Sequence, residues 1–129
     1  MKTLLAFLFI STQVLAVSNP LIRNCQMSGG QFLVFQTEGN DVPTCHVGQS
    51  FIGAMDLMNH INQDQPSQSI IDYTSSIYFC QAQQIQLKTT EGFAVDFCFY
   101  DDGSVIDMNS LYKGRYSADQ KALNHALGL

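Results

Sequence analysis

Residues 31–45 read Q-F-L-V-F-Q-T-E-G-N-D-V-P-T-C, and residues 84–98 repeat much of this pattern as Q-I-Q-L-K-T-T-E-G-F-A-V-D-F-C. Aligned without a gap, the two stretches share six identical positions, and the members of each pair lie 53 residues apart. The identical pairs are Gln31/Gln84, Thr37/Thr90, Glu38/Glu91, Gly39/Gly92, Val42/Val95 and Cys45/Cys98. A repeated segment indicates two related structural units, so it predicts both the architecture and the cysteine pairing.

The chain has four cysteines, and four cysteines allow three disulfide pairings. The repeat favours Cys25–Cys45 and Cys80–Cys98, because each ancestral unit would have carried its own bridge. Loops of 20 and 18 residues are long enough for each bridge to stabilise the fold by about 3 kcal/mol. There is no C-x-x-C motif and the three histidines are scattered, so we expect no metal site and no cofactor.

The first 16 residues have the features of a signal peptide. Lys2 supplies a positive start, residues 4–10 are apolar, and Ala16 ends a small-residue cleavage motif. The apolar run is too short to span a bilayer. No cysteine directly follows Ala16, so a lipid anchor is not expected. We therefore predict an exported bacterial protein, periplasmic or extracellular, whose disulfides form in an oxidising compartment.

The charge composition of the chain argues against two classes of binding partner. Cleavage after Ala16 leaves about 113 residues, enough for one domain or two small fused units. The formal net charge of −5 becomes −6 without Lys2, with five Lys and Arg against eleven Asp and Glu. This acidic balance argues against nucleic acid and against an anionic membrane surface as partners. The acidic residues are scattered along the chain, which favours a role in solubility.

The first unit, residues 17–62, is predicted to run helix, strand, strand, helix. Asn19 can cap a helix that starts at Pro20 and ends at Gly29-Gly30. Residues 31–37 and 42–47 are predicted strands around a turn. Ser50 can then cap a helix over residues 51–62. The apolar stripe of this helix has five members: Phe51, Ala54, Met55, Met58 and Ile61.

The second unit, residues 74–129, is predicted to repeat this plan after a polar linker at 63–73. Within the linker, Ile70-Ile71 read as the start of a short strand. The unit itself is predicted to have a helix over 74–83, strands over 85–89 and 93–100, a helix that ends at Gly114, and a last helix over 118–127. The predicted inner face of the helix before Gly114 consists of Val105, Met108, Leu111 and Tyr112.

The strand at 93–100 has the clearest alternation. Its apolar face has four members, which are Phe93, Val95, Phe97 and Phe99. Cys98 lies on the opposite face, which the helix carrying Cys80 would cover. The apolar row must then be buried against the first unit. The predicted fold is therefore α+β, with two tandem helix-strand-strand-helix units that share a core, antiparallel strands and disulfide staples.

The order of short motifs also resembles a known domain family. The motifs are Asn19-Pro20, Asn24-Cys25, Gly29-Gly30 and Cys45, and then residues 98–107 with Leu111-Tyr112-Lys113-Gly114. Together they resemble tandem copies of the small exported bacterial domain called haemolysin-like, a family of unknown function. The resemblance covers residues 20–62 and 74–114. The family usually has a tryptophan in its closing segment, where this chain has Asn109, and the first copy has Gly48-Gln49-Ser50 in place of D-G-S.

No constellation of residues points to catalysis, so we predict that the protein is not an enzyme and has no catalytic residue. A nucleophilic cysteine needs a free thiolate beside a histidine, and Cys45 and His46 would point to opposite faces of a strand. A serine elbow of the form G-x-S-x-G is missing from the sequence. The repeated turn residues Glu38 and Glu91 are typical of solvated turns, and the acidic residues of 101–107 are typical of a turn rather than a calcium loop.

A rigid scaffold with exposed turns is typical of a binding protein. The candidate binding residues are Glu38, Gly39, Asn40, Asp41, Glu91 and Gly92. We expect a protein partner rather than nucleic acid or a membrane. Two other functions remain open: a protease inhibitor that presents residues 37–43 as a rigid loop, and a membrane-active haemolysin-like protein that uses the helix at 118–127.

Overall fold

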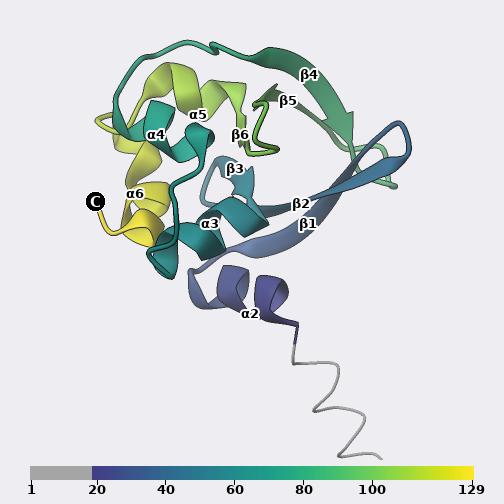
Figure 1. The fold of residues 1–129 in the computed structure, drawn as a ribbon, viewed down its shortest axis with the longest axis horizontal. Coiled ribbons are helices and arrows are strands. Elements are labelled where there is room, and N and C mark those ends of the chain that lie inside the picture. The colour runs from purple at the N-terminus through teal and green to yellow at the C-terminus, as the bar shows by residue number, and fades with distance from the viewer. Residues whose placement is uncertain (1–18) are drawn as a thin grey trace, which may run out of the picture.

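The computed structural model describes residues 19–129, so the predicted signal peptide at 1–16 lies outside the described residues. Six antiparallel strands close into a barrel in the order β1-β2-β3-β6-β5-β4. Helices precede, separate and follow these strands, so the fold is mixed α and β (Figure 1). The strands are β1 (Gln31–Thr37), β2 (Asn40–Val47), β3 (Ser50–Gly53), β4 (Gln83–Lys88), β5 (Ala94–Phe99) and β6 (Val105–Asp107).

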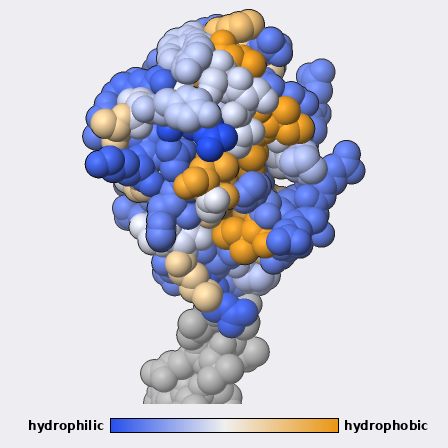
Figure 2. Space-filling view, turned by 90° about the vertical axis from the view of Figure 1, so that its left-hand side faces the viewer, coloured by the Kyte–Doolittle hydropathy of each residue, from blue (hydrophilic) through white to orange (hydrophobic). Residues whose placement is uncertain are grey.

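The helices cover one side of the barrel. They are α2 (Pro20–Met27), α3 (Ala54–Ile61), α4 (Gln68–Thr74), α5 (Met108–Lys113) and α6 (Lys121–Leu127), with a 3₁₀ turn, η1 (Ala118–Gln120), before α6. The β1–β2 and β4–β5 hairpins point away from α4, α5 and α6 (Figure 1). The opposite, helical side is mainly hydrophilic, and its apolar side chains form several separate patches (Figure 2). Within residues 19–129, no helix has the length and apolarity to cross a membrane.

Local sequence signals account for the two long hairpins and for α2. The Asn19 side chain accepts hydrogen bonds from the N–H groups of Leu21 and Ile22, and Pro20 starts the helix as predicted. In the first hairpin, β1 and β2 pair in register over the whole of β1. In the second, β4 and β5 pair over six positions. The alternation of apolar residues and the intervening turn residues are sufficient to specify both hairpins.

Each half of the chain has a third strand, which the sequence analysis read as the first turn of a helix. Residues 50–53 form β3 and residues 105–107 form β6, so the predicted helices over 51–62 and before Gly114 start later, at Ala54 and Met108. All seven strand residues are buried. A strand covered on both faces shows no alternation, and segments as short as Ser50–Gly53 and Val105–Asp107 cannot be told from a helix by periodicity.

The later start of α3 also changes which of its residues face the core. Leu57, which was outside the predicted stripe, is fully buried, whereas Met55 and Ile61 are 47% and 42% exposed. Phe51 and Ala54 are buried as predicted, but the stripe was wrong at Met55 and Ile61, because Phe51 belongs to β3 and does not set the phase of the helix. Asp56 is buried in the first turn of this helix.

The helix predicted over 74–83 is wrong, and a helix lies inside the predicted linker instead. α4 includes Ile70, so the short strand expected there is also wrong. Residues 75–82 have no regular structure, and Ser76 and Tyr78 have positive φ angles of 54° and 67°. Tyr78 packs against Gly114, where an added Cβ would lie 2.9 Å from a ring carbon. This part of the second half therefore does not repeat the first half, where Cys25 lies within α2.

Two hydrophobic clusters hold the fold together. The barrel interior is filled by Phe35, Val42, Phe51, Leu87, Phe97 and Val105. Phe97 of β5 lies edge-on to Phe35 of β1, with ring centroids 5.0 Å apart. Of the expected row at 93–99, Phe97 is fully buried, Val95 and Phe99 are half-buried against the same cluster, and Phe93, which precedes the strand, is 52% exposed. The second cluster lies between the barrel and the helices and includes Cys25, Cys45 and Cys98.

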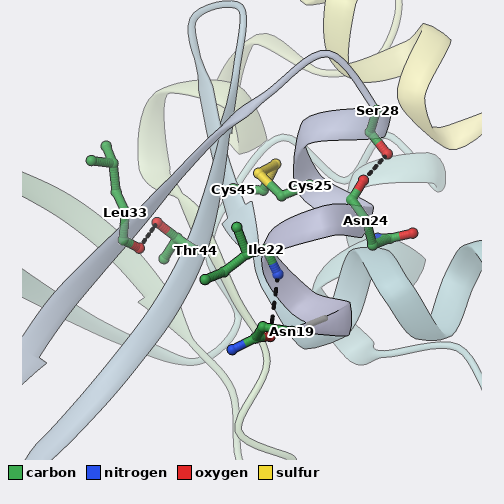
Figure 3. The surroundings of a disulfide bond; sticks show 8 residues. All are labelled: Asn19, Ile22, Asn24, Cys25, Ser28, Leu33, Thr44 and Cys45. Carbon is green, nitrogen blue, oxygen red and sulfur yellow. Dashed lines mark hydrogen bonds between the residues drawn. A yellow bond between two sulfur atoms is a disulfide. The ribbon is translucent and has the colours of Figure 1, made fainter. Parts of the chain in front are cut away.

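The two disulfides are Cys25–Cys45 and Cys80–Cys98, the pairs favoured by the repeat. The first joins α2 to β2 (Figure 3). Beside it, the Thr44 hydroxyl donates a 2.9 Å hydrogen bond to the carbonyl of Leu33, which ties β2 to β1 (Figure 3). The second joins the irregular segment 75–82 to β5. The two disulfides suggest an oxidising environment.

Candidate functional site

The structure brings the two predicted binding loops to the same end of the barrel. Gln36 of β1 pairs with Lys88 of β4, close to the tip of each hairpin. This bridge places the two hairpin tips side by side (Figure 1). The six predicted binding residues are all exposed: Glu38, Gly39, Asn40, Asp41, Glu91 and Gly92. We call this surface the hairpin end, and it consists of these six residues and Phe93.

Both tips have a backbone that is fixed by local bonding. In the first hairpin, Thr37 pairs with Asn40, which leaves only Glu38 and Gly39 in the turn. Gly39 has a φ of 81°, in the region that favours glycine. In the second hairpin, the backbone N–H of Phe93 donates to the Thr89 hydroxyl at 3.2 Å, and the Thr89 N–H donates back to the Phe93 carbonyl at 2.9 Å. The hairpin end is therefore ordered without any ligand.

Phe93 is the apolar member of the hairpin end. Its ring centroid lies 6.2 Å from that of Phe35 and 5.9 Å from that of Phe51, so its inner edge contacts the barrel interior. The other half of its surface faces solvent. An aromatic residue that is anchored on one side and open on the other is suited to a protein contact.

Charge at the hairpin end is mainly negative. Glu38, Asp41 and Glu91 are exposed carboxylates, and Lys88 is the one basic residue in the paired strand ends beside them. Glu91 accepts a 3.2 Å hydrogen bond from the Thr90 hydroxyl. The surface is complementary to a partner with basic groups around an apolar contact.

Two buried carboxylates tie the halves together: Asp56, which no sequence pattern indicated, and Asp107, which lies in the segment 101–107 considered above as a calcium loop. Asp56 of α3 accepts a 3.0 Å hydrogen bond from the Val105 N–H of β6, and Asp107 accepts one of 2.8 Å from the Phe51 N–H of β3. Burial raises the pKa of Asp56 to about 6, although Val105 and Ser67 donate to it. Burial also raises the pKa of Asp107, against the hydrogen bonds from Phe51. These residues are bonded into the β3–β6 junction, so we assign them a structural role.

The residues considered from the sequence as a cysteine nucleophile with its histidine, or as calcium ligands, are engaged in other contacts. Cys45 is in a disulfide, and the ring of His46 stacks on Phe51 at 4.0 Å. Asp102 accepts from the backbone N–H groups of Gln68 and Ser104, while Asp107 is buried in the β3–β6 junction. Among residues 19–129, no group of three His, Cys, Asp or Glu side chains has the geometry to hold a metal ion.

Neither of the two alternative functions gains support from the geometry. Residues 37–43 lie within the paired β1–β2 hairpin, whereas an inhibitory loop presents a free extended backbone to the protease. The helix predicted over 118–127 is divided into η1 and α6, and its Gln120, Leu123 and Leu127 are buried against the core. Its apolar face is therefore already covered.

Comparison of the chain with protein-family models, curated proteins and solved structures finds no match. The resemblance to haemolysin-like domains therefore stays a prediction, and the fold and its surfaces are the basis for any functional proposal.

Proposed function

We propose that this is an exported, non-enzymatic binding protein that holds a protein partner on the hairpin end. The observation that carries the proposal is the bridge between Gln36 and Lys88, since it gathers two turns distant in sequence into one ordered surface. The partner would present basic groups to Glu38, Asp41 and Glu91 and an apolar group to Phe93. The two disulfides suit export to the periplasm or the cell exterior.

We also infer that the chain arose by duplication of one unit. Ile52 pairs with the β2 cysteine, and Ile106 pairs with the β5 cysteine, so these two isoleucines occupy corresponding places. The barrel is closed where Ile52 and Ile106 pair with each other. Its other closing bridge joins Gln36 to Lys88, the chain neighbour of Thr89, which aligns with Gln36. If a two-fold axis relates the two halves, each bridge that crosses the axis joins residues at equivalent or adjacent positions of the two halves.

A capture experiment with matched variants tests the binding proposal. The mature protein is immobilised and exposed to the fluid or compartment in which it accumulates, and retained proteins are identified by mass spectrometry. The double variant Glu38→Lys/Glu91→Lys reverses the charge of the hairpin end, and Phe93→Ala removes its apolar contact. The control is Asp64→Lys, which changes an exposed carboxylate in the α3–α4 loop, away from the hairpin tips (Figure 1).

We expect a partner that the natural protein and Asp64→Lys retain and that both hairpin variants lose. A partner retained equally by all variants would show that binding occurs elsewhere. Turnover of a substrate in a broad hydrolase panel, abolished by a point substitution, would overturn the non-enzymatic assignment.

A further inference from the structure

A second surface, separate from the hairpin end, has the properties of a ligand site. It is a cleft of about 680 Å³ between α4, the start of β4 and the β5–β6 turn. Its lining residues are Gln68, Asp72, Gln81, Ala82, Gln83, Tyr100, Asp101 and Asp102. Three of them are carboxylates, three are glutamines and none is basic. We call this the acidic cleft.

Two buried polar groups of the cleft lining lack a well-formed hydrogen bond. Asp72 and Tyr100 are each 4% exposed, the Asp72 Oδ2 atom and the Tyr100 hydroxyl have no partner with good geometry, and the hydroxyl lies within interaction range of the Asp72 carboxylate. Burial and the nearby Asp72 carboxylate raise the pKa of Tyr100, so its hydroxyl keeps its proton. Buried polar groups are nearly always paired in folded proteins, and an unpaired one calls for an explanation.

A nitrogen donor already occupies part of this site. The Gln68 side-chain amide donates to the other Asp72 oxygen, Oδ1, at 2.7 Å. Gln68 is exposed and lies at the start of α4, so its side chain can rotate away without disturbing the helix. A ligand N–H that takes the place of this amide would meet the Asp72 carboxylate.

The available groups favour an organic cation over a metal ion. Both oxygens of Asp102 are already used, Oδ2 by the Gln68 N–H and Oδ1 by the N–H and hydroxyl of Ser104. The carboxylates with the fewest hydrogen bonds are then those of Asp72 and Asp101, and no three His, Cys, Asp or Glu side chains of the described chain are placed to share a metal ion. Ammonium and guanidinium groups only donate hydrogen bonds, and they match a lining of carboxylates and amide carbonyls.

The corresponding place in the first half is closed by a helix. Gly48 lies in the β2–β3 turn, which corresponds to the β5–β6 turn that carries Asp101. A Cβ placed on Gly48 would lie 2.7 Å from the Cβ of Ala122 in α6, so that helix is seated directly on the turn. In the second half, Asp101 instead borders the acidic cleft.

We propose that the acidic cleft binds an alkylammonium or guanidinium group, either a basic side chain of a peptide or a free polyamine. The cation lies between Asp72 and Asp101, and its N–H groups replace the Gln68 amide at Asp72. Tyr100 contributes its hydroxyl and the face of its ring.

The test is an NMR titration of the ¹⁵N-labelled mature protein at low ionic strength. The probes are N-acetyl-arginine amide and N-acetyl-lysine amide for a basic side chain, spermidine for a polyamine, and calcium alone for a metal. We expect at least one organic cation to give saturable shifts confined to the amides of residues 68–72, 81–83 and 100–102. The probe that binds more tightly identifies the source of the cation.

Four variants assign the binding to named groups. We expect Asp72→Asn and Asp101→Asn each to weaken binding by about tenfold or more, and Gln68→Ala to leave it unchanged or tighter. The control, Asp96→Asn, removes an exposed carboxylate of β5 outside the cleft and should have no effect. Asp101 is exposed, so its variant remains informative if Asp72→Asn fails to fold. Shifts scattered over the acidic surface, tighter binding of calcium, or full binding by Asp101→Asn would overturn the proposal.

Discussion

Replacing Asp56 by Asn should make the protein more stable at pH 7 than it is with its natural carboxylate. Asp56 is buried, with a pKa of about 6 against an ordinary value of 3.8. A carboxyl whose pKa is higher in the folded state binds its proton more tightly there than in the unfolded chain. The free energy of unfolding that it contributes is therefore present at acidic pH and lost as the pH rises through the folded pKa.

The size of the effect follows from the shift. Each pKa unit corresponds to about 1.4 kcal/mol, so ionising Asp56 costs the fold about 3 kcal/mol by pH 7. The amide of Asp56→Asn is neutral at every pH, and its oxygen can still accept from the Val105 N–H. At pH 4 the unfolded carboxyl, with its ordinary pKa of 3.8, is already partly ionised, so the advantage of the variant over the natural protein should grow by about 2 kcal/mol between pH 4 and pH 7.

Urea unfolding at a series of pH values measures this difference. The chain has five tyrosines and no tryptophan, so tyrosine fluorescence and far-ultraviolet circular dichroism are the suitable signals. Asp64→Asn, an exposed carboxylate, is the control and should show no pH-dependent advantage. A difference between Asp56→Asn and the natural protein that is the same at pH 4 and pH 7 would refute the argument from burial.

Two further perturbations test other parts of the fold. The double variant Cys80→Ala/Cys98→Ala opens a loop that the disulfide closes at a separation of 18 residues, so it should lower the free energy of unfolding by about 3 kcal/mol in the same urea assay. An unchanged free energy of unfolding would show that this disulfide does not stabilise the irregular segment 75–82. Gly114→Ala should lower the melting temperature more than Gly103→Ala, because both glycines have positive φ but only an added Cβ at Gly114 meets the ring of Tyr78. Equal losses would show that the contact with Tyr78 is unimportant.

The sequence predicted those parts of the fold whose causes are local. The two hairpins depend on alternation and on glycine turns, and α2 depends on Asn19 and Pro20, so each could be read within a short window. The binding loops could be named for the same reason. Their meeting at one end could not be derived, because it depends on the distant pair Gln36 and Lys88.

The helix that was missed depends on partners far away in the sequence. α4 was read as linker and strand because its capping groups come from the β5–β6 turn. Asp102 accepts from the Gln68 N–H at 2.8 Å, and the Ser104 hydroxyl accepts from the Ser69 N–H at 3.1 Å. These partners lie 34 and 35 residues away, beyond any local helix-start signal. β3 and β6 were missed for a different reason: they pair mainly with their chain neighbours β2 and β5, but each is short and wholly buried, so it lacks the alternation that marks a strand.

This capping arrangement also explains why the two halves differ in their surfaces. The second half has Asp102-Gly103-Ser104 after β5, and these side chains hold α4 by its first N–H groups. The first half has Gly48-Gln49-Ser50 at the same place and lacks the carboxylate that could hold a helix end in this way. Its turn is instead small enough for α6 to pack directly on Gly48. Because α4 is held only by its first N–H groups, open space remains beside the β5–β6 turn, whereas α6 packs on the β2–β3 turn and fills that space. The acidic cleft therefore occurs only in the second half of the described chain.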